Sequence, residues 1–193
     1  MTDEKKMQIE ERLLELPLAQ YAWIRTEELT FLERVRYICE TECPRYGTSW
    51  ACPPAVGTVE ECREKCLSYE EGFLFTTFSE VADIADLEQT LAYRAGHEET
   101  TRRVRDIFKE RGLEVMALST ESCAVCETCA YPEEFCRHPE KMFPCVESYG
   151  ILVTELAEKC DIEFMYGGNV VTWFSLLFFR ENPGGPVALG GMP

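Results

Sequence analysis

Positive charge is scarce in this sequence of 193 residues. Lys and Arg total 19 against 35 Asp and Glu, and the formal net charge is −16. Nucleic acids and anionic membrane surfaces are bound through basic surfaces, so this balance argues against both as partners. Hydrophobic residues make up 46% of the chain and aromatic residues 11%, which is typical of a globular protein and argues against a disordered acidic chain.

Long hydrophobic segments are also missing. The longest apolar run, Val170–Phe179, is about half the length of a membrane-spanning helix. The first 20 residues are charged and amphipathic, without the apolar centre of a secretory signal. We therefore expect a cytoplasmic protein that does not contact a membrane.

Two kinds of functional motif are rare or missing. No glycine-rich phosphate loop occurs, so nothing in the sequence supports a nucleotide or flavin site. The only histidines are His97 and His138. We expect His97 on the surface of a polar helix. We expect His138 in an exposed loop, although it follows Cys136 closely enough to bind or tune a metal.

Cysteine, in contrast, is abundant, with eleven residues. Disulfides stabilise mainly small secreted domains, whereas this chain is long enough to form a hydrophobic core and has an odd number of cysteines. Reduced cysteines that cluster this densely are usually metal ligands. The sequence therefore predicts a cysteine-rich, metal-binding protein.

The second cysteine region begins with CAVCETCAYPEEFCRHP. Two residues separate Cys123 from Cys126 and Cys126 from Cys129, and Cys136 follows after six more. Such a loop directs three thiolates inward, and a more distant fourth closes the coordination of a 4Fe-4S cluster. The usual ferredoxin motif has a shorter last gap and a proline directly after the fourth cysteine, whereas Pro139 comes three positions later. Structural zinc is the alternative metal, although zinc sites normally use two separated cysteine pairs.

The first cysteine region supplies Cys39, Cys43 and Cys52 within CETECPRYGTSWACPP. We expect a metal site with three or four thiolates here, with Cys62 or Cys66 as a candidate fourth ligand. Cys62 and Cys66 are four positions apart, as on one face of a helix. The alternative is therefore that they are small buried hydrophobic residues.

Two long motifs give the chain a resemblance to a known family. They are VRYICETECPRYGTSWACPP and CAVCETCAYPEEFCRHPEK, and SYGILV follows them. From about Arg34 to Phe179 the chain resembles a family of cysteine-rich bacterial and archaeal proteins described as predicted metal-binding proteins of unknown function. The resemblance implies metal binding but no reaction. It places the expected ligands on Cys39, Cys43, Cys52, Cys123, Cys126, Cys129 and Cys136.

One position departs from the expected family pattern. Where Pro-Ser-Met-Glu is expected, residues 144–147 are PCVE, so Cys145 is either an extra ligand or a buried residue, as we expect for Cys160. Seven ligands are one short of two four-thiolate clusters. Three interpretations remain open: an eighth ligand among Cys62, Cys66 and Cys145, one cluster with an open iron, or a single composite site with spare thiols.

The hydrophobic pattern predicts an α+β fold, with a mixed or antiparallel sheet flanked by helices and two cysteine-rich metal-binding loops. We expect a single metal-binding domain over residues 1–193. Its expected parts are an N-terminal helix within residues 1–20, the first cysteine region at 39–66, a strand-helix-strand unit at 72–119, the second cysteine region at 123–145 and a flexible tail at 181–193.

Some elements have clear local signals. Residues 25–38 fit either a short turn capped by Thr26 or a strand, and the alternation at residues 34–37 favours a strand that leads into the first cysteine region. Thr58 and Asp86 are expected to cap the helices that follow them. We expect a break in the second of these helices near Gly96. The remaining expected elements include a helix at 146–159 and a strand at 162–165 that a hairpin joins to a strand at 170–179.

The sequence thus predicts an iron-sulfur protein with one or two 4Fe-4S clusters that acts in electron transfer or redox support to a partner protein. One alternative is a metalloenzyme that binds a small substrate at an open iron. Another is an interaction module that zinc stabilises. The oligomeric state and the metal of the first cysteine region are left open.

Overall fold

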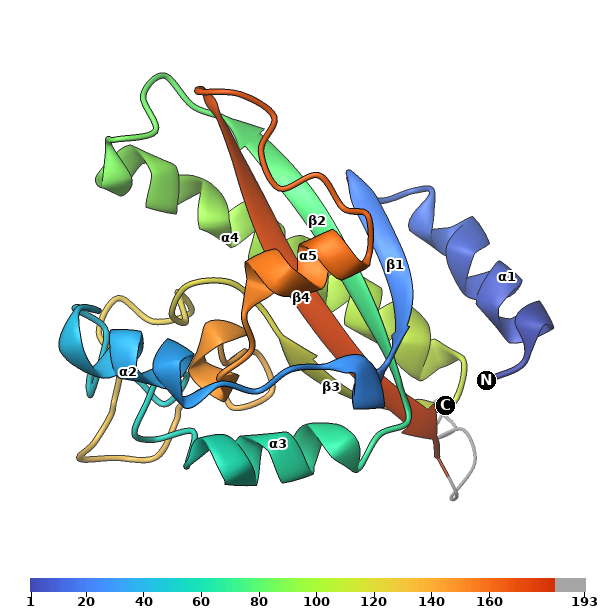
Figure 1. The fold of residues 1–193 in the computed structure, drawn as a ribbon, viewed down its shortest axis with the longest axis horizontal. Helices are drawn as coiled ribbons and strands as arrows, with labels where there is room; N and C mark the ends of the chain where they lie inside the picture. Colours follow the sequence, from blue (N-terminus) through green and yellow to red (C-terminus); the bar gives the residue numbers. More distant parts are fainter. Residues whose placement is uncertain (183–193) are drawn as a thin grey trace, which may run out of the picture.

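The computed structural model describes residues 1–182, and most of the tail expected at 181–193 lies outside these residues. The centre of the fold is one sheet with the strand order β1-β2-β4-β3, in which all neighbours are antiparallel. Figure 1 shows β2 and β4 as the long central pair. The strands are β1 (Gln20–Arg25), β2 (Glu71–Glu80), β3 (Leu113–Leu118) and β4 (Val170–Glu181).

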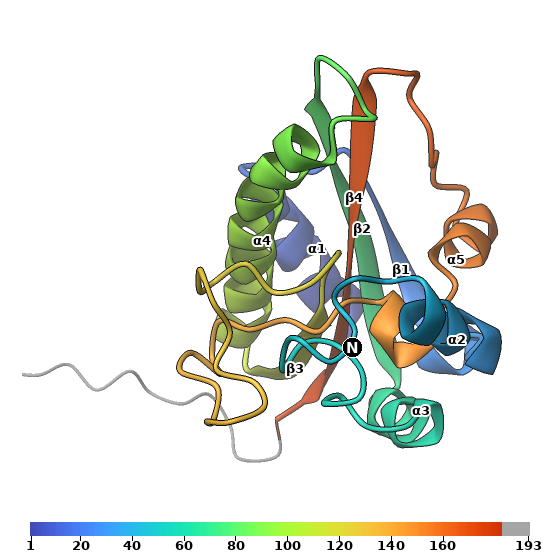
Figure 2. The same ribbon diagram turned by 90° about the vertical axis from the view of Figure 1, so that its left-hand side faces the viewer.

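Helices cover both faces of this sheet. Figure 2 shows α1 and α4 on one face and α2, α3 and α5 on the other. The α+β prediction is therefore confirmed. The helices are α1 (Asp3–Leu13), α2 (Glu33–Thr41), α3 (Val59–Leu67), α4 (Leu87–Glu110) and α5 (Val153–Lys159), with short 3-10 turns η1 (Thr26–Glu28) and η2 (Glu147–Tyr149).

The central strands are apolar on both sides because both faces are covered. Successive side chains of a strand point to opposite faces. Phe174, Leu176 and Phe178 of β4 pack into the core beneath α3 and α5, whereas Leu177 and Phe179 pack into the core beneath α1 and α4. Two separate hydrophobic cores therefore hold the sheet between its helical layers.

Two predicted helix caps are present. Thr58 and Glu61 form a capping box at the start of α3, and Asp86 accepts a hydrogen bond from the Gln89 N–H at the start of α4 (3.0 Å). The predicted break near Gly96 is wrong, because α4 continues through it. Arg94 and His97, on either side of Gly96, are both buried, and α4 lies along one face of the sheet (Figure 2).

The strand predicted at 34–38 is wrong, because these residues belong to α2. Val35 and Arg36 are both buried, while Tyr37 and Ile38 are exposed, so burial does not alternate as a strand requires. Arg36 donates to the carbonyl oxygens of Gly57 (2.6 Å) and Ser148. These buried hydrogen bonds hold the segment against its neighbours as a helix.

The strand predicted at 162–165 is also wrong. Both edges of β4 are already paired, one with β2 and the other with β3. A further strand therefore has no free edge of β4 to join. The Glu163 N–H instead bonds to the side-chain oxygen of Gln20 (2.8 Å).

The helix predicted at 146–159 is divided into η2 and α5 by Gly150. This residue has a φ of 79°, the left-handed conformation that glycine adopts readily. A Cβ here would lie 2.9 Å from the Val59 side chain and 3.3 Å from the Leu32 carbonyl oxygen. The Leu32 N–H also donates to the Gly150 carbonyl (2.8 Å), so this crossing needs a residue without a side chain.

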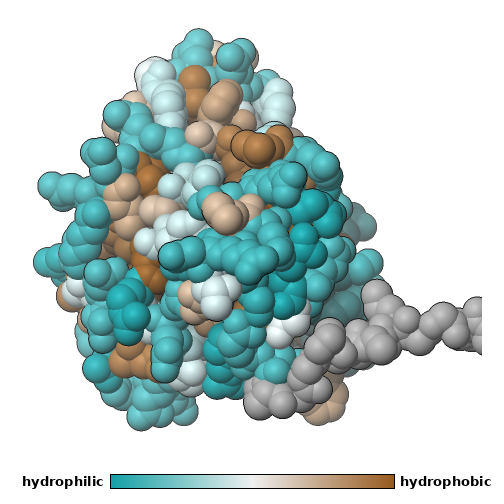
Figure 3. Space-filling view, turned by 90° about the vertical axis from the view of Figure 1, so that its right-hand side faces the viewer, coloured by the Kyte–Doolittle hydropathy of each residue, from teal (hydrophilic) through white to brown (hydrophobic). Residues whose placement is uncertain are grey.

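The two cysteine regions lie at the same end of the molecule, beside α2 and the end of β3 (Figure 1). The face seen in Figure 3, on the side of the molecule away from these loops, is mostly hydrophilic with small apolar groups. Within residues 1–182, no helix has both the length and the apolar character needed to cross a bilayer.

Candidate metal centre

The two cysteine regions, far apart in sequence, pack directly against each other. The Trp50 indole N–H donates to the Glu134 carbonyl oxygen (3.0 Å), and its ring meets Tyr131 edge-on with 5.0 Å between ring centres. The Cys52 thiol lies 3.2 Å from the Ser122 hydroxyl oxygen. These contacts join the loop after α2 to the loop after β3.

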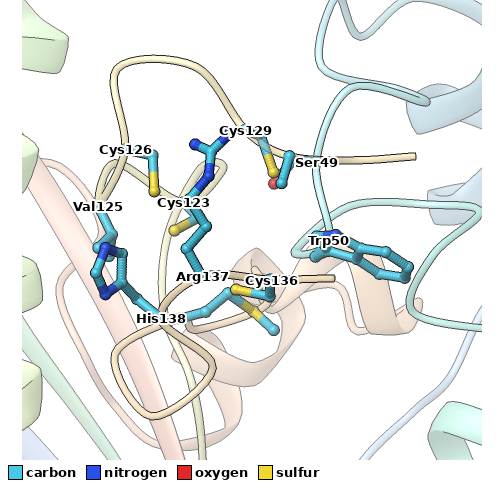
Figure 4. A pocket seen from close by; sticks show the side chains of 11 residues that line it. Ser49, Trp50, Cys123, Val125, Cys126, Cys129, Cys136, Arg137 and His138 are labelled. Carbon is cyan, nitrogen blue, oxygen red and sulfur yellow. The ribbon is translucent and has the colours of Figure 1, made fainter. Parts of the chain in front are cut away.

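Four cysteines of the second region line one cavity, which we call the second-region cavity. It encloses about 360 Å³ of empty space, part of it open to solvent, and Ser49 and Trp50 of the first region complete its wall. Figure 4 shows the sulfur atoms arranged around this space, with the Cys129 sulfur beside Ser49. The four cysteines are Cys123, Cys126, Cys129 and Cys136.

The loop that carries these cysteines has little regular structure and is held by hydrogen bonds. Arg137 donates to the Thr128 carbonyl (3.0 Å), which closes the loop on itself. From α4, Arg105 donates to the Glu140 carbonyl (2.7 Å), and Glu98 accepts from the Ala124 N–H (3.3 Å). The long helix α4 therefore positions the loop at both ends.

The thiols of the second-region cavity differ in how readily they ionise. Burial raises the pKa of Cys123 to about 11, and the charge of Glu98 adds to this increase. At Cys129 burial also acts to raise the pKa, but backbone N–H groups of Tyr131 and Trp50 and the Ser49 hydroxyl outweigh it, so the pKa is lowered. Hydrogen bonds to sulfur stabilise the thiolate, which is the form that binds metals.

Three cysteines of the first region line a separate, larger cavity, and the structure adds a fourth, Cys145. This first-region cavity encloses about 710 Å³ of empty space, part of it open to solvent. Cys39 comes from α2, Cys43 and Cys52 come from the loop after it, and Cys145 comes from the segment before η2.

Other polar groups share the wall of the first-region cavity. They are Arg45, Tyr46, Glu121, Ser122 and Glu147. Burial raises the pKa of the Glu147 carboxyl to about 7. Burial also raises the pKa of Cys39 to about 11, and the neighbouring Cys43 contributes. Burial raises the pKa of Cys145 as well, with further contributions from Glu147 and Cys52. The cavity therefore concentrates acidic groups whose ionised forms a bound cation would stabilise.

The remaining three cysteines line neither of these cavities. Cys62 and Cys66 of α3 are 0% exposed and belong to the hydrophobic core beneath α3 and α5. Cys160, at the end of α5, is half-buried and packs against the same core. In the structure Cys62 and Cys66 are therefore small buried residues of the hydrophobic core, as the alternative interpretation predicted.

The two histidines are in different surroundings from those expected. The surface position predicted for His97 is wrong, since it is only 3% exposed and lies between Thr77 and Ser175. Its position on α4, facing the sheet, buries it. His138 is half-buried and lines the second-region cavity. No sequence signal at His97 pointed to burial.

Within residues 1–182, no three His, Cys, Asp or Glu side chains converge closely enough to form a ready-made site for a single ion. What the structure provides is two cavities with thiol-bearing walls. The sequence did not indicate that Glu147 lines the first-region cavity or that Arg36 is buried beside it, and it left the role of Cys145 undecided. The departure at residues 144–147 was the only signal for Cys145, and it did not show which cavity this residue lines.

Comparison with known proteins supports a metal-binding role. A family model described as "Predicted metal-binding protein (DUF2284)" matches residues 22–179, a range that includes both cysteine regions. No curated protein and no solved structure shows detectable similarity to the chain. Because the match spans most of the sequence, the chain belongs to this family of predicted metal-binding proteins.

Proposed function

We propose that the protein is an iron-sulfur protein that transfers electrons to or from a partner protein. The proposed ligands of a 4Fe-4S cluster are Cys123, Cys126, Cys129 and Cys136. The observation that carries this proposal is that all four cysteines line one cavity. Such clusters are held by four Cys thiolates, and when bound they supply reversible one-electron transfer.

The donor set of the second-region cavity fits this group. Its wall holds four thiols, and none of the described residues that line it carries a carboxylate. Soft thiolate ligands favour iron-sulfur clusters and zinc over hard cations such as Mg²⁺ and Ca²⁺. The N–H and hydroxyl groups that lower the pKa of Cys129 are also the groups that would hydrogen-bond a ligating sulfur.

Residues around the cavity support a redox role. Trp50 and Met142 line its wall as bulky apolar groups and limit the access of water. Arg137 is a cation on the same wall, and its charge would offset the negative charge of a thiolate cluster. Solvent access, hydrogen bonds to sulfur and nearby charge all tune the potential of such clusters.

We propose a second metal site on Cys39, Cys43 and Cys52, which line the first-region cavity together. One observation favours a different function here. The cavity is large and is also lined by Arg45, Glu121 and Glu147, so an open iron beside these groups would give a metalloenzyme acting on a small substrate. Binding of a substrate or exogenous ligand would then change the spectrum of the cluster.

The second cysteine region also offers a contact surface for a redox partner. Phe135 is 91% exposed although it is next to Cys136, and Glu133 and Glu134 beside it are exposed. An exposed aromatic group with acidic neighbours fits a partner that has an apolar pocket with basic residues around it. We place this exchange in the cytoplasm, where thiols stay reduced.

The test is to purify the protein without oxygen and to quantify iron, acid-labile sulfide and zinc. We expect iron and sulfide in equal amounts, an absorption band near ~400 nm from sulfur-to-iron charge transfer, and reversible one-electron reduction. Cys126→Ser should lose the cluster, whereas Cys160→Ser, at a position that lines neither cavity, should keep it. A colourless protein with zinc and no sulfide would contradict the proposal and support the zinc-stabilised module.

A further inference from the structure

The structure assigns a fourth protein ligand to the metal site of the first cysteine region. We propose that Cys145 completes this site with Cys39, Cys43 and Cys52, so that the chain holds two separate four-thiolate centres. This inference deepens the proposed function and rests on it for the identity of the metal. The assignment of the four cysteine ligands is the same whichever metal is bound.

Position in the fold selects Cys145 among the three candidates. Cys145 lines the first-region cavity together with Cys39, Cys43 and Cys52. Its rivals are on α3, where Cys66 is enclosed in the hydrophobic core. The Cys62 thiol lies 3.5 Å from the Val56 carbonyl and 3.8 Å from an Arg36 nitrogen, so its contacts are with groups outside the cavity wall.

Hydrogen bonds to neighbouring segments fix the backbone at Cys145. Ser119, just beyond β3, pairs with Cys145 in a parallel bridge. The Ser119 N–H donates to the Pro144 carbonyl (2.8 Å), and the Val146 N–H donates to the Ser119 carbonyl (2.9 Å). The Ser148 hydroxyl donates to the Cys145 carbonyl (2.6 Å). These bonds hold the thiol at the cavity wall, where it is 8% exposed.

One buried cation joins the two halves of this site. Arg36 lies on α2, one turn before Cys39, and donates to the carbonyl oxygens of Ser148 and Gly57. It therefore ties the helix that carries Cys39 to the turn that follows Cys145. Arg36 also places a positive charge one turn from Cys39 on the same helix. Ligands that are already held in place, next to the positive charge of Arg36, favour the binding of a metal centre with negatively charged thiolates.

The other polar groups on the wall suit a supporting role better. Glu121 and Glu147 offer hard oxygen donors, whereas iron-sulfur clusters and structural zinc favour thiolates. The Ser122 hydroxyl already lies 3.2 Å from the Cys52 sulfur. With Cys145 as fourth ligand, every iron of the first-region cluster has a protein thiolate, which removes the open position required by the metalloenzyme alternative.

The test compares Cys145→Ala with Cys66→Ala, a matched control that removes another buried thiol. After anaerobic reconstitution we expect about eight iron atoms in the wild type and in Cys66→Ala, because each 4Fe-4S cluster contains four. In Cys145→Ala we expect about half of this iron, or a three-iron electron paramagnetic resonance signal after mild oxidation that the wild type lacks. Wild-type iron, sulfide and spectrum in Cys145→Ala would overturn the inference.

A measurement on the wild type covers the case in which Cys145→Ala does not fold. Cadmium added without oxygen to the metal-free wild type binds cysteine thiolates, and its nuclear magnetic resonance shift reports the number of sulfur ligands. Two cadmium signals that each indicate four thiolate ligands support the inference. One signal for four thiolates and a second signal for three thiolates overturn it. If the wild type holds zinc without sulfide, the iron-sulfur function fails, but the loss of about one of two zinc ions in Cys145→Ala still supports the ligand assignment.

Discussion

Burial of His97 should make the stability of the protein depend on pH in a specific way. The ring lies between two hydroxyl groups, with Nδ1 2.8 Å from the Thr77 oxygen and Nε2 2.8 Å from the Ser175 oxygen. Burial lowers the pKa of His97 from 6.5 to about 4. In the unfolded chain the ring regains its ordinary pKa, so the unfolded state binds a proton at a higher pH than the folded state does.

The sign and size of the effect follow from this difference. Above pH ~7 both states hold a neutral ring, and His97 contributes no pH dependence. As the pH falls from about 6.5 to about 4, only the unfolded state gains the proton, so the native state loses stability. One pKa unit is worth about 1.36 kcal/mol, which gives a loss of about 2 kcal/mol between pH ~8 and pH ~5 and about 3 kcal/mol in full.

The assay is urea unfolding of the wild type and of His97→Gln at several values between pH ~8 and pH ~5. Glutamine can bond to both hydroxyls but does not titrate, so the variant should lack about 2 kcal/mol of the wild-type pH dependence. Equal slopes for the wild type and His97→Gln would refute the reasoning.

Three further predictions concern the surroundings of the cavities. Arg36→Met should lower the free energy of unfolding by about 3 kcal/mol, because the buried Ser148 carbonyl and the half-buried Gly57 carbonyl lose a charged donor. Urea unfolding tests this, and exposed Arg34→Met should have little effect. Glu98→Gln should raise the potential of the second-region cluster by roughly tens of millivolts, because Glu98 contacts the loop that carries the cysteines and loss of its negative charge favours the reduced cluster. An unchanged midpoint in an anaerobic titration contradicts this. Phe135→Ser should slow electron transfer to a basic cytochrome about tenfold, because the exposed ring no longer makes an apolar contact with the partner. Reduction of the protein by a small dye should stay unchanged. Equal slowing of both reactions would argue against a docking role.

The wrong strand predictions share one physical cause. Residues 34–38 and 162–165 have short patterns that a strand and an irregular or helical segment can both satisfy. Which one forms depended on distant partners, namely the carbonyls that Arg36 reaches and the strands that already occupy both edges of β4. In contrast, the caps at Thr58 and Asp86 were predictable because a capping box uses residues only three positions apart.

The sequence by itself determined that Cys123, Cys126 and Cys129 stay close together, because two-residue gaps leave three thiols little room to separate. It also determined the two-sided apolar strand β4, whose side chains alternate between two cores. Only the tertiary structure decided which cavity Cys145 lines, that Cys62 and Cys66 pack in the core, and that His97 is buried. These outcomes depend on how β3, α2, α3 and α4 pack against the sheet, and such contacts join residues too far apart in sequence for any local pattern to record them.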